Sequence, residues 1–302
     1  MSSEFSPLIS IVVCTYNGEK HLKEQLDSLV NQTYRNLEII VVDDCSNDST
    51  IQIIREYESN FSFVKLYENG SNLGYVKNFE KGILLCKGEF ILLSDQDDIW
   101  DLNKVSCMYE YIGDNLLLYH DSEFIEEDGA RMNKKMSERM NFYHGSNGLP
   151  FTLYNCVSGH TMMFKRDLIK LALPFDTRFF HDWWLVYVAA SKGKINFVNK
   201  TLVKYRQHIK STIDMLELKP IKKQDEHLLM SKLDWIKKCA ELNSPYQQYL
   251  HKLSILLDGN KNYWNKIKLY LHVRKAAPAL MFIRKDTHKH NFKVLKKSVF
   301  NI

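Results

Sequence analysis

Residues 89–100 read Glu89-Phe90-Ile91-Leu92-Leu93-Ser94-Asp95-Gln96-Asp97-Asp98-Ile99-Trp100, an apolar run that ends in three carboxylates. A run of this length, rich in Phe, Ile and Leu, predicts a strand that is buried on both faces. The acids follow the carboxyl end of that strand, and in open α/β sheets the ligand crevice lies just outside such ends. Asp95 and Asp97 stand at i and i+2, so their side chains are expected to point the same way in an extended chain.

Two neighbouring carboxylates repel each other unless a positive charge lies between them, and a hard divalent cation is the common solution. A solvated acidic turn that caps the next helix is the alternative interpretation. A calcium loop of the EF-hand type is excluded, because Trp100 stands where that loop needs glycine and Ser106 stands where it needs a bidentate Glu.

The composition is that of a soluble globular protein. The chain has 302 residues, of which 45% are hydrophobic and 25% are charged. No stretch approaches the ~18 uncharged apolar residues of a membrane span, and the N-terminus lacks a signal-peptide pattern, so we expect a cytoplasmic protein. The six cysteines show no CxxC spacing, which indicates reduced thiols rather than a zinc site or a disulfide framework.

The net charge of +5 is unevenly spread along the chain. Residues 261–302 hold eleven Lys and Arg against the single acid Asp286, and aromatic residues such as Trp264 are interleaved with them. This mixture predicts a peripheral contact with the anionic inner face of the membrane. A solvated basic helix pair is the alternative, and nucleic acid is not expected as a partner because no nucleic-acid motif accompanies the charge.

Apolar strand-like runs alternate with amphipathic helical segments through the first hundred residues. Strands are expected at 8–14, 37–42, 63–67 and 89–94, with helices between them. This rhythm predicts an α/β fold with a mostly parallel sheet and helices on both faces. Polar residues follow three of these strands. Neither GxGxxG nor GxxxxGK[ST] occurs, which excludes an NAD-type Rossmann site and a P-loop.

The pattern changes after Trp100. We expect a mobile surface loop over residues 130–148, two short strands at 195–198 and 202–208, and amphipathic helices after about residue 212. The predicted division is a catalytic domain at 1–214 and a helical, basic C-terminal region at 215–302. Asp182 opens an apolar helix, where an acid commonly acts as a cap, but Trp183 and Trp184 beside it offer flat faces for a sugar ring.

Four motifs occur in an order and spacing that resemble the family 2 glycosyltransferases of the GT-A fold. They are Ile-Val-Val-Cys-Thr-Tyr-Asn (11–17), Val-Val-Asp-Asp-Cys-Ser-Asn-Asp-Ser-Thr (41–50), Asn-Leu-Gly with Asn78 (72–74), and Ser-Asp-Gln-Asp-Asp (94–98). The resemblance covers roughly residues 8–212. With Gly-His-Thr (159–161), His-Asp-Trp-Trp (181–184) and Tyr-Arg-Gln-His (205–208), the chain looks most like bacterial rhamnosyltransferases that use dTDP-L-rhamnose.

The resemblance implies a role for each motif. The residues implied in binding the nucleotide-sugar are Thr15, Asn17, Asp43, Asp44, Asn72, Lys77, Asp95, Gln96, Trp183, Trp184 and Arg206. Gly159 and His160 would contact the acceptor. Asp95, Asp97 and His208 would bind Mg²⁺ or Mn²⁺, with Asp97 as the preferred direct ligand. Lys77 as a plain surface lysine, and Arg206 and His208 as structural residues, are the alternatives.

Asp182 matches the family's general base, which takes the proton of the acceptor hydroxyl in an inverting displacement. Two departures from the family pattern stand out. Cys45 occupies a position that is more often Gly, and His181 precedes the base where the family usually has Glu. The first leaves the backbone path at Cys45 open, and the second leaves the role of His181 open.

The resemblance therefore implies a metal-dependent inverting hexosyltransferase that adds L-rhamnose to a hydroxyl of a lipid-linked or growing surface polysaccharide. The alternatives are the same fold with a UDP-hexose donor, a non-catalytic nucleotide-sugar-binding subunit of a glycan assembly complex, and a nucleotide-sugar hydrolase. The sequence leaves a homodimer open as the form of assembly.

Overall fold

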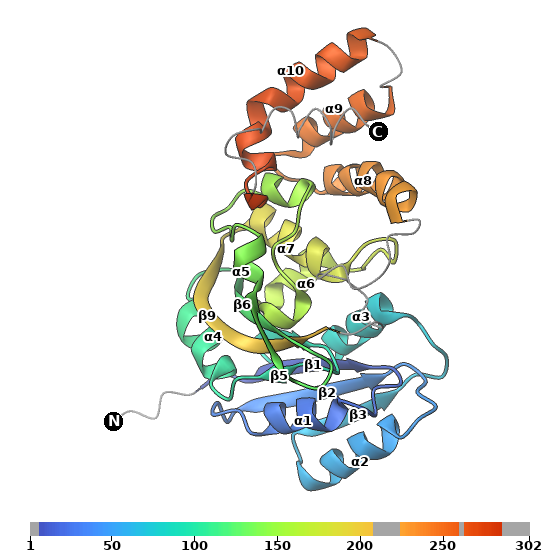
Figure 1. The fold of residues 1–302 in the computed structure, drawn as a ribbon, viewed down its shortest axis with the longest axis vertical. Coiled ribbons are helices and arrows are strands. Elements are labelled where there is room, and N and C mark those ends of the chain that lie inside the picture. The colour runs from blue at the N-terminus through green and yellow to red at the C-terminus, as the bar shows by residue number, and fades with distance from the viewer. Residues whose placement is uncertain (1–5, 208–223, 260–262, 286–302) are drawn as a thin grey trace.

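The structure is a computed structural model that describes residues 6–207, 224–259 and 263–285. Its elements follow one another along the chain as shown in Figure 1. The strands are β1 (Ile9–Thr15), β2 (Leu37–Asp43), β3 (Val64–Glu68), β4 (Phe90–Ser94), β5 (Ile99–Trp100), β6 (Leu117–Ile125), β7 (Arg131–Lys135), β8 (Met162–Lys165) and β9 (Ile195–Arg206). The α-helices are α1 (Leu22–Val30), α2 (Thr50–Asn60), α3 (Tyr75–Leu85), α4 (Lys104–Ile112), α5 (Met136–Arg139), α6 (Ile169–Ala172), α7 (His181–Lys192), α8 (Gln224–Glu241), α9 (Gln247–Asp258) and α10 (Tyr263–Leu280), and the 3₁₀ helices are η1 (Leu149–Thr152), η2 (Gly159–Thr161) and η3 (Arg166–Leu168).

All the described strands belong to one curved sheet with the order β3-β2-β1-β4-β8-β6-β9-β5, and β7 pairs with β6 at the side. The first four strands are parallel, as the alternating sequence pattern predicts. The sheet is mixed beyond β4, because β8 runs antiparallel to both β4 and β6 while β9 runs parallel to β6. The expectation of a mostly parallel sheet therefore holds only for its N-terminal half.

Alternating residues of the buried strands face two separate cores. Val12 and Ile40 pack with α3 and α7 on one face of the sheet, whereas Ile11 and Ile39 pack with α1, α2 and α4 on the other. The helices supply the apolar positions that these faces need: α1 buries Leu22, Leu26 and Leu29 at helical spacing. Burying one such side chain contributes roughly 1.5–3 kcal/mol to the free energy of unfolding.

The C-terminal helices pack on the α7 side of the sheet (Figure 1). Trp235 and Cys239 of α8 join the same hydrophobic cluster as Tyr187 of α7, and the hydroxyl of Tyr187 donates a hydrogen bond of 3.0 Å to the carbonyl of Cys239. The predicted division at residue 214/215 lies outside the described residues and stays a prediction. None of the helices in the described ranges combines the length and apolar character needed to cross a bilayer.

Two local predictions are wrong. Residues 130–148 are ordered rather than a structureless mobile loop, because β7 pairs with β6, Met136 is buried, and the backbone of Gly145 pairs with Ile195. The two short strands expected at 195–208 form the single strand β9, in which shifts of register let one strand follow the bend of β6.

Candidate active site

Three polar turns meet at one edge of the sheet. β1, β2 and β4 run parallel, and their register places Thr15 beside Asp43 and Val13 beside Ser94. The turns that follow these strands therefore leave the sheet side by side, as the sequence predicts for the carboxyl ends of parallel strands.

The turn after β2 is organised by Asp43, which is fully buried. Its Oδ2 accepts hydrogen bonds from the hydroxyls of Thr15 (2.7 Å) and Ser46 (2.6 Å), and its Oδ1 accepts one from the backbone N–H of Ser46 (2.8 Å). These bonds explain how a buried carboxylate is tolerated, and they hold the loop in one conformation.

Asp44 is satisfied by the segment that precedes α3. Its Oδ1 accepts from the backbone N–H of Leu73 at 2.8 Å and from the amide of Asn69 at 2.7 Å, and its Oδ2 accepts from the N–H of Gly74 at 2.9 Å. The side-chain amide of Asn72 donates to the carbonyl of Asp44 at 3.1 Å. These bonds tie the turn after β2 to the segment that precedes α3.

The backbone is left-handed at Asn17 (φ 48°) and at Cys45 (φ 66°). This conformation favours glycine, which explains why glycine is the more frequent residue at the position of Cys45. Asn is among the residues that tolerate the left-handed region, and the side-chain oxygen of Asn17 accepts the N–H of Asn47 at 2.9 Å.

Gln96 connects the turn after β4 to the turn after β1. It accepts the N–H of Tyr16 at 2.9 Å and donates to the carbonyl of Tyr16 at 3.2 Å. A Cβ at Gly18 would lie 2.3 Å from its Oε1, so a side chain at position 18 would displace the Gln96 amide from Tyr16. On the neighbouring helix, Lys77 pairs with Glu80 at 2.8 Å.

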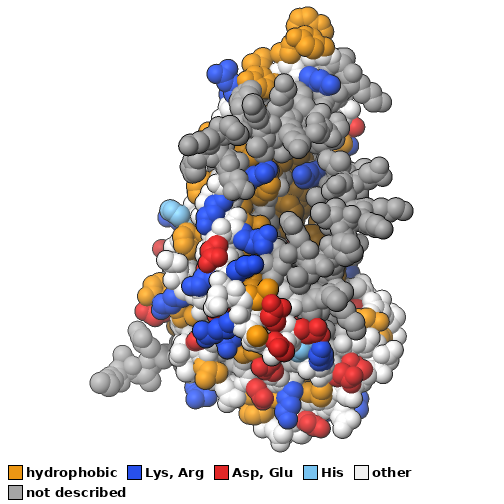
Figure 2. Space-filling view, viewed as in Figure 1, with side chains coloured by type: hydrophobic (Ala, Val, Ile, Leu, Met, Phe, Trp, Pro, Cys, Tyr) orange, Lys and Arg blue, Asp and Glu red, His pale blue; other side chains and the backbone are white. Residues whose placement is uncertain are grey.

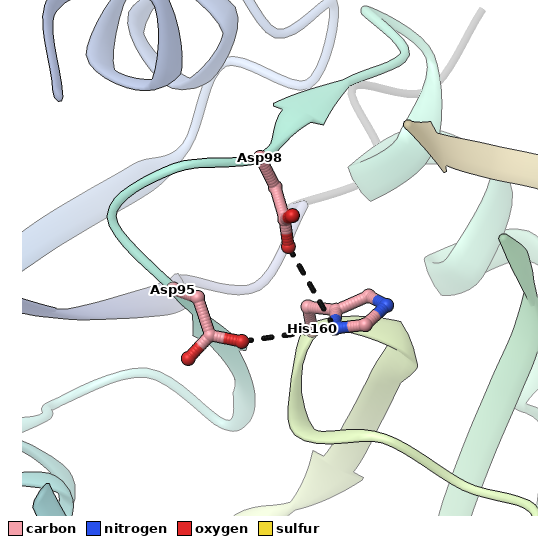
Figure 3. Close-up of side chains that lie close together, drawn as sticks. All are labelled: Asp95, Asp98 and His160. Atoms are coloured by element: carbon pink, nitrogen blue, oxygen red, sulfur yellow. Dashed lines mark ion pairs between the residues drawn. The ribbon is translucent and has the colours of Figure 1, made fainter. Parts of the chain in front are cut away.

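Asp95, Asp98 and His160 converge beside these turns (Figure 3). The Nδ1 atom of His160 lies 3.7 Å from Oδ2 of Asp95 and 3.6 Å from Oδ2 of Asp98. Both separations are longer than a hydrogen bond. Two ligands held about 2.1 Å from one cation lie roughly 3–4 Å apart, so the spacing suits three donors around a small divalent ion.

The electrostatics of this cluster would favour a bound cation. Burial, with the charges of Asp97 and Asp95 adding to it, raises the pKa of Asp98 well above its usual range. Burial lowers the pKa of His160, which favours the neutral imidazole that a metal requires. Oδ2 of Asp98 and Nε2 of His160 have no hydrogen-bond partner among the described residues. A cation would offset the cost of this buried carboxylate.

The cluster differs from the predicted ligand set. It contains Asp95 but not Asp97, whose side chain is half-buried and whose carbonyl accepts a 2.8 Å bond from Nε of Arg206. Ligation by Asp97 therefore stays a prediction, and His208 lies outside the described residues.

Arg206 is buried and donates a hydrogen bond to the backbone of the acidic turn after β4. Its guanidinium also donates to the carbonyl of Glu127 at 2.8 Å and to the carboxylate of Glu24 at 2.6 Å. These contacts satisfy the buried guanidinium within the protein, and the predicted contact of Arg206 with the diphosphate stays a prediction.

Lys104 lies under the cluster and is fully buried. It donates a 2.6 Å hydrogen bond to the carbonyl of His160, and its ammonium lies 3.1 Å from the centre of the Trp100 ring. Burial lowers the pKa of Lys104 well below its usual value, while the nearby Asp98 and Asp95 oppose that shift.

Asp182 reaches the cluster through the backbone of η2. Its Oδ2 accepts the N–H of Gly159 at 3.1 Å and its Oδ1 accepts the N–H of Trp183 at 2.6 Å. Burial raises the pKa of Asp182 to about 7, although both N–H groups oppose the shift. A carboxylate with this pKa can take up a proton near neutral pH, which is the property of a general base.

The residues around Asp182 take different positions. Neither ring nitrogen of His181 is hydrogen-bonded within the described residues; the ring stacks on Phe79 at 4.3 Å, and burial lowers the pKa of His181 to about 4. Trp183 is half-buried and donates to the carbonyl of Phe151. Trp184 is buried and donates to the carbonyl of Ala172 at 2.8 Å, and its predicted contact with the sugar stays a prediction.

A family model described as glycosyl transferase family 2 matches residues 10–172, more than half of the chain. The chain belongs to this family. An uncharacterised glycosyltransferase of Haemophilus influenzae is 26% identical over 216 residues, covering 68% of this chain and 67% of that protein. Another, from Methanocaldococcus jannaschii, is 28% identical over 209 residues, covering 66% and 71%. This family 2 enzyme therefore transfers a sugar from a nucleotide-sugar.

Solved structures show the same GT-A fold for this family 2 glycosyltransferase. TarS of S. aureus, crystallised in complex with UDP-GlcNAc, is 17% identical and aligns over 90% of this chain and 81% of its own with a TM-score of 0.59. The mannosyltransferase PcManGT of Pyrobaculum calidifontis, in complex with GDP-Man and Mn²⁺, is 16% identical and aligns over 91% and 76% with a TM-score of 0.56.

Sequence reasoning missed two residues of this glycosyltransferase, Asp98 as a partner of Asp95 and Lys104 beneath them. Asp98 is the third acid of the quoted stretch, but the i, i+2 rule for strands does not extend into a turn, where the chain is no longer extended. Nothing in a sequence marks a lysine for full burial, because lysine is among the residues that are rarely buried.

Proposed function

We propose that the enzyme is a metal-dependent, inverting glycosyltransferase. The observation that carries the proposal is the segment Gly159–His160. One of its residues holds the carboxylate of Asp182, and the next faces Asp95 and Asp98. The proposed base, Asp182, thus contacts Gly159, and the proposed cation site includes the next residue of the same short helix, His160.

Mg²⁺ or Mn²⁺ fits the oxygen-rich cluster, and Asp95, Asp98 and His160 would hold it, with Asp97 as a further ligand. When bound, the cation supplies positive charge that stabilises a departing nucleoside diphosphate. Asp182 then acts on the acceptor: its carboxylate takes the hydroxyl proton while that oxygen attacks the anomeric carbon. A single displacement of this kind inverts the anomeric configuration.

The nucleoside is proposed to lie over the turns after β1 and β2. Oδ1 of Asp43 accepts one hydrogen bond from Ser46, so a lone pair is available for a ring N–H of the base. The proposed nucleoside site would also be shaped by four residues that make hydrogen bonds with the backbone of these turns and of the segment before α3: Asn17, Asp44, Asn72 and Gln96. Lys77 is proposed to lie near the diphosphate.

We propose L-rhamnose from dTDP-L-rhamnose as the sugar, on the resemblance of the motifs at 94–98, 159–161 and 181–184. The complexes of TarS with UDP-GlcNAc and of PcManGT with GDP-Man and Mn²⁺ support a nucleoside diphosphate donor in general. A UDP-hexose is therefore the second candidate. The proposed acceptor is a lipid-linked or growing surface polysaccharide, reached by a cytoplasmic enzyme at the inner face of the membrane; a homodimer is the proposed alternative to a monomer.

A panel of dTDP-, UDP- and GDP-sugars tests the proposal by thermal shift, with and without Mn²⁺. At about a hundredfold excess over Kd, the true donor should raise the Tm by roughly 4 °C, and only with the cation present. Release of nucleoside diphosphate that requires an acceptor would support transfer. Equal release without an acceptor would identify a hydrolase instead, and a shift that is independent of Mn²⁺ would contradict the metal role.

A further inference from the structure

The exposed face of α10 carries an ordered stripe of apolar and cationic side chains. At 3.6 residues per turn, positions 264, 268, 271, 275 and 278 fall on one side of the helix, and position 282 follows two residues after the helix ends at Leu280. They hold Trp264, Lys268, Leu271, Lys275, Pro278 and Phe282, and every one of them is exposed. The opposite side holds Leu269, Val273 and Leu280, which are buried. The stripe is therefore the face that α10 leaves free when it packs on the molecule.

Charge and exposure on this stripe are unusual for a solvated surface. Trp264 is 70% exposed and Leu271 is 52% exposed, and the adjacent Tyr263 is 73% exposed. Residues 263–285 contain no Asp or Glu, so nothing on this segment neutralises its cations. Figure 2 shows hydrophobic and cationic side chains together in the upper part of the molecule, where α10 lies, while acidic side chains gather over the lower half.

A cavity of about 560 Å³ lies at the C-terminal end of the stripe. Its apolar wall comes from three places: the segment after α5, strand β9 and the end of α10. The apolar residues that line it are Met140, Phe142, Phe197, Pro278, Met281 and Phe282. Lys285 is its one charged lining residue, and Pro278 and Phe282 belong to the stripe as well. A volume of this size suits an apolar ligand chain.

We propose that the stripe on α10 docks on an anionic phospholipid bilayer and that the cavity at its end receives an acyl chain of that bilayer. Aromatic and aliphatic residues on such a face enter the boundary between headgroups and chains, and the lysines extend their ammonium groups to the anionic headgroups. The proposal rests on the proposed function, in which the enzyme works at the inner face of the membrane, and it assigns a surface for that contact that does not involve the strand-end turns.

The docking test is co-sedimentation of the full chain with vesicles of phosphatidylglycerol and phosphatidylcholine in equal parts. Each cation near an anionic surface strengthens binding about fivefold, so Lys268→Glu/Lys275→Glu should weaken it at least ~25-fold. The matched control is Lys23→Glu/Lys65→Glu, which changes the net charge equally but affects exposed lysines of α1 and β3, at the far end of the molecule (Figure 1). Equal binding by the two double variants would overturn the proposal.

The apolar part of the stripe has its own variants. Trp264→Ala/Leu271→Ala should weaken vesicle binding about tenfold, whereas Leu84→Ala, at an exposed position of α3, should not change it. The thermal shift produced by a nucleotide-sugar should be the same in all these variants. A variant that loses vesicle binding but keeps that shift separates docking from sugar transfer.

The cavity is tested by fluorescence quenching with phosphatidylglycerol that carries bromine on its acyl chains. In a chain that also carries Trp264→Phe, so that the native tryptophan of the stripe is absent, a tryptophan introduced as Phe282→Trp should be quenched in these vesicles, and one introduced as Tyr111→Trp on α4 should not. No quenching at position 282, with vesicle binding intact, would remove the acyl chain from the cavity and overturn that part of the proposal.

Discussion

The turns after β2 and after β4 leave the sheet at the same edge, yet their carboxylates are satisfied in different ways. Asp43 and Asp44 accept several hydrogen bonds each from neighbouring residues, and these bonds close the loop around them. Asp98 lies equally deep, but its Oδ2 has no hydrogen-bond partner within the described ranges, and His160 stands just beyond bonding distance. The carboxylates of the first turn are satisfied by hydrogen bonds within the protein. The second leaves one buried carboxylate oxygen without a hydrogen-bond partner among the described residues, and this is where we propose that a cation binds.

The largest effect should come from Asp182, which is tied to the second turn through Gly159. Asp182→Asn keeps the size of the side chain and one of its two backbone contacts but cannot accept a proton, so kcat should fall about 10³-fold. Donor binding, measured by thermal shift, should be unchanged. A variant that retains full activity would show that the base is another residue.

The contrast between the two turns can be tested directly with Asp98→Asn and Asp43→Asn. Asp98→Asn should weaken Mn²⁺ binding, measured by calorimetry, about 10²-fold. In the absence of metal it should raise the Tm, because the raised pKa of Asp98 means that its charge destabilises the fold at neutral pH.

Asp43→Asn should have the opposite pattern. The new amide would face donors, so the free energy of unfolding should fall by about 2–3 kcal/mol while Mn²⁺ affinity stays the same. Chemical denaturation measures the first quantity and calorimetry measures the second. If both variants behaved alike, the proposed difference between the turn after β2 and the turn after β4 would be contradicted.

The pH dependence of turnover should be set by the second region as well. The base must be deprotonated, and the pKa of Asp182 is about 7. The transfer rate should therefore fall about tenfold for each pH unit below 7 and level off above it. The residual rate of Asp182→Asn serves as the control and should lack this inflection.

The smallest effect is expected at Lys77. Its ion pair with Glu80 is partly exposed, so Lys77→Ala should change the free energy of unfolding by less than about 0.5 kcal/mol. If the ammonium also approaches the diphosphate, the Kd of the donor should rise about fivefold in a titration. A Kd equal to that of the unchanged protein would leave Lys77 as a surface residue.

The sequence predicts the fold well where the period of the apolar residues is unambiguous. The four N-terminal strands and the position of Asp43, Asp44 and Asp95 at their ends are confirmed, because buried parallel strands leave continuous apolar runs that stop where the polar turns begin. The prediction fails at residues 130–148, since the pairing of β7 with β6 is set by tertiary contacts that a weak local pattern does not reveal.

Side-chain direction is the other limit. Trp183 and Trp184 are neighbours in the sequence, but on α7 they point about 100° apart, and tertiary packing buries Trp184 while it leaves Trp183 half-buried. Arg206 shows the same difficulty, because a residue type suited to phosphates is equally suited to backbone carbonyls such as those of Asp97 and Glu127.

In the proposed mechanism, the residue that contacts the base and the residue that belongs to the cation site are joined by one peptide bond. Gly159 and His160 cannot move independently, and Lys104 holds the same short helix from beneath. A redesign that moves this segment to change the proposed acceptor site would therefore also shift His160 in the proposed cation site, so donor and acceptor selectivity would have to be redesigned together.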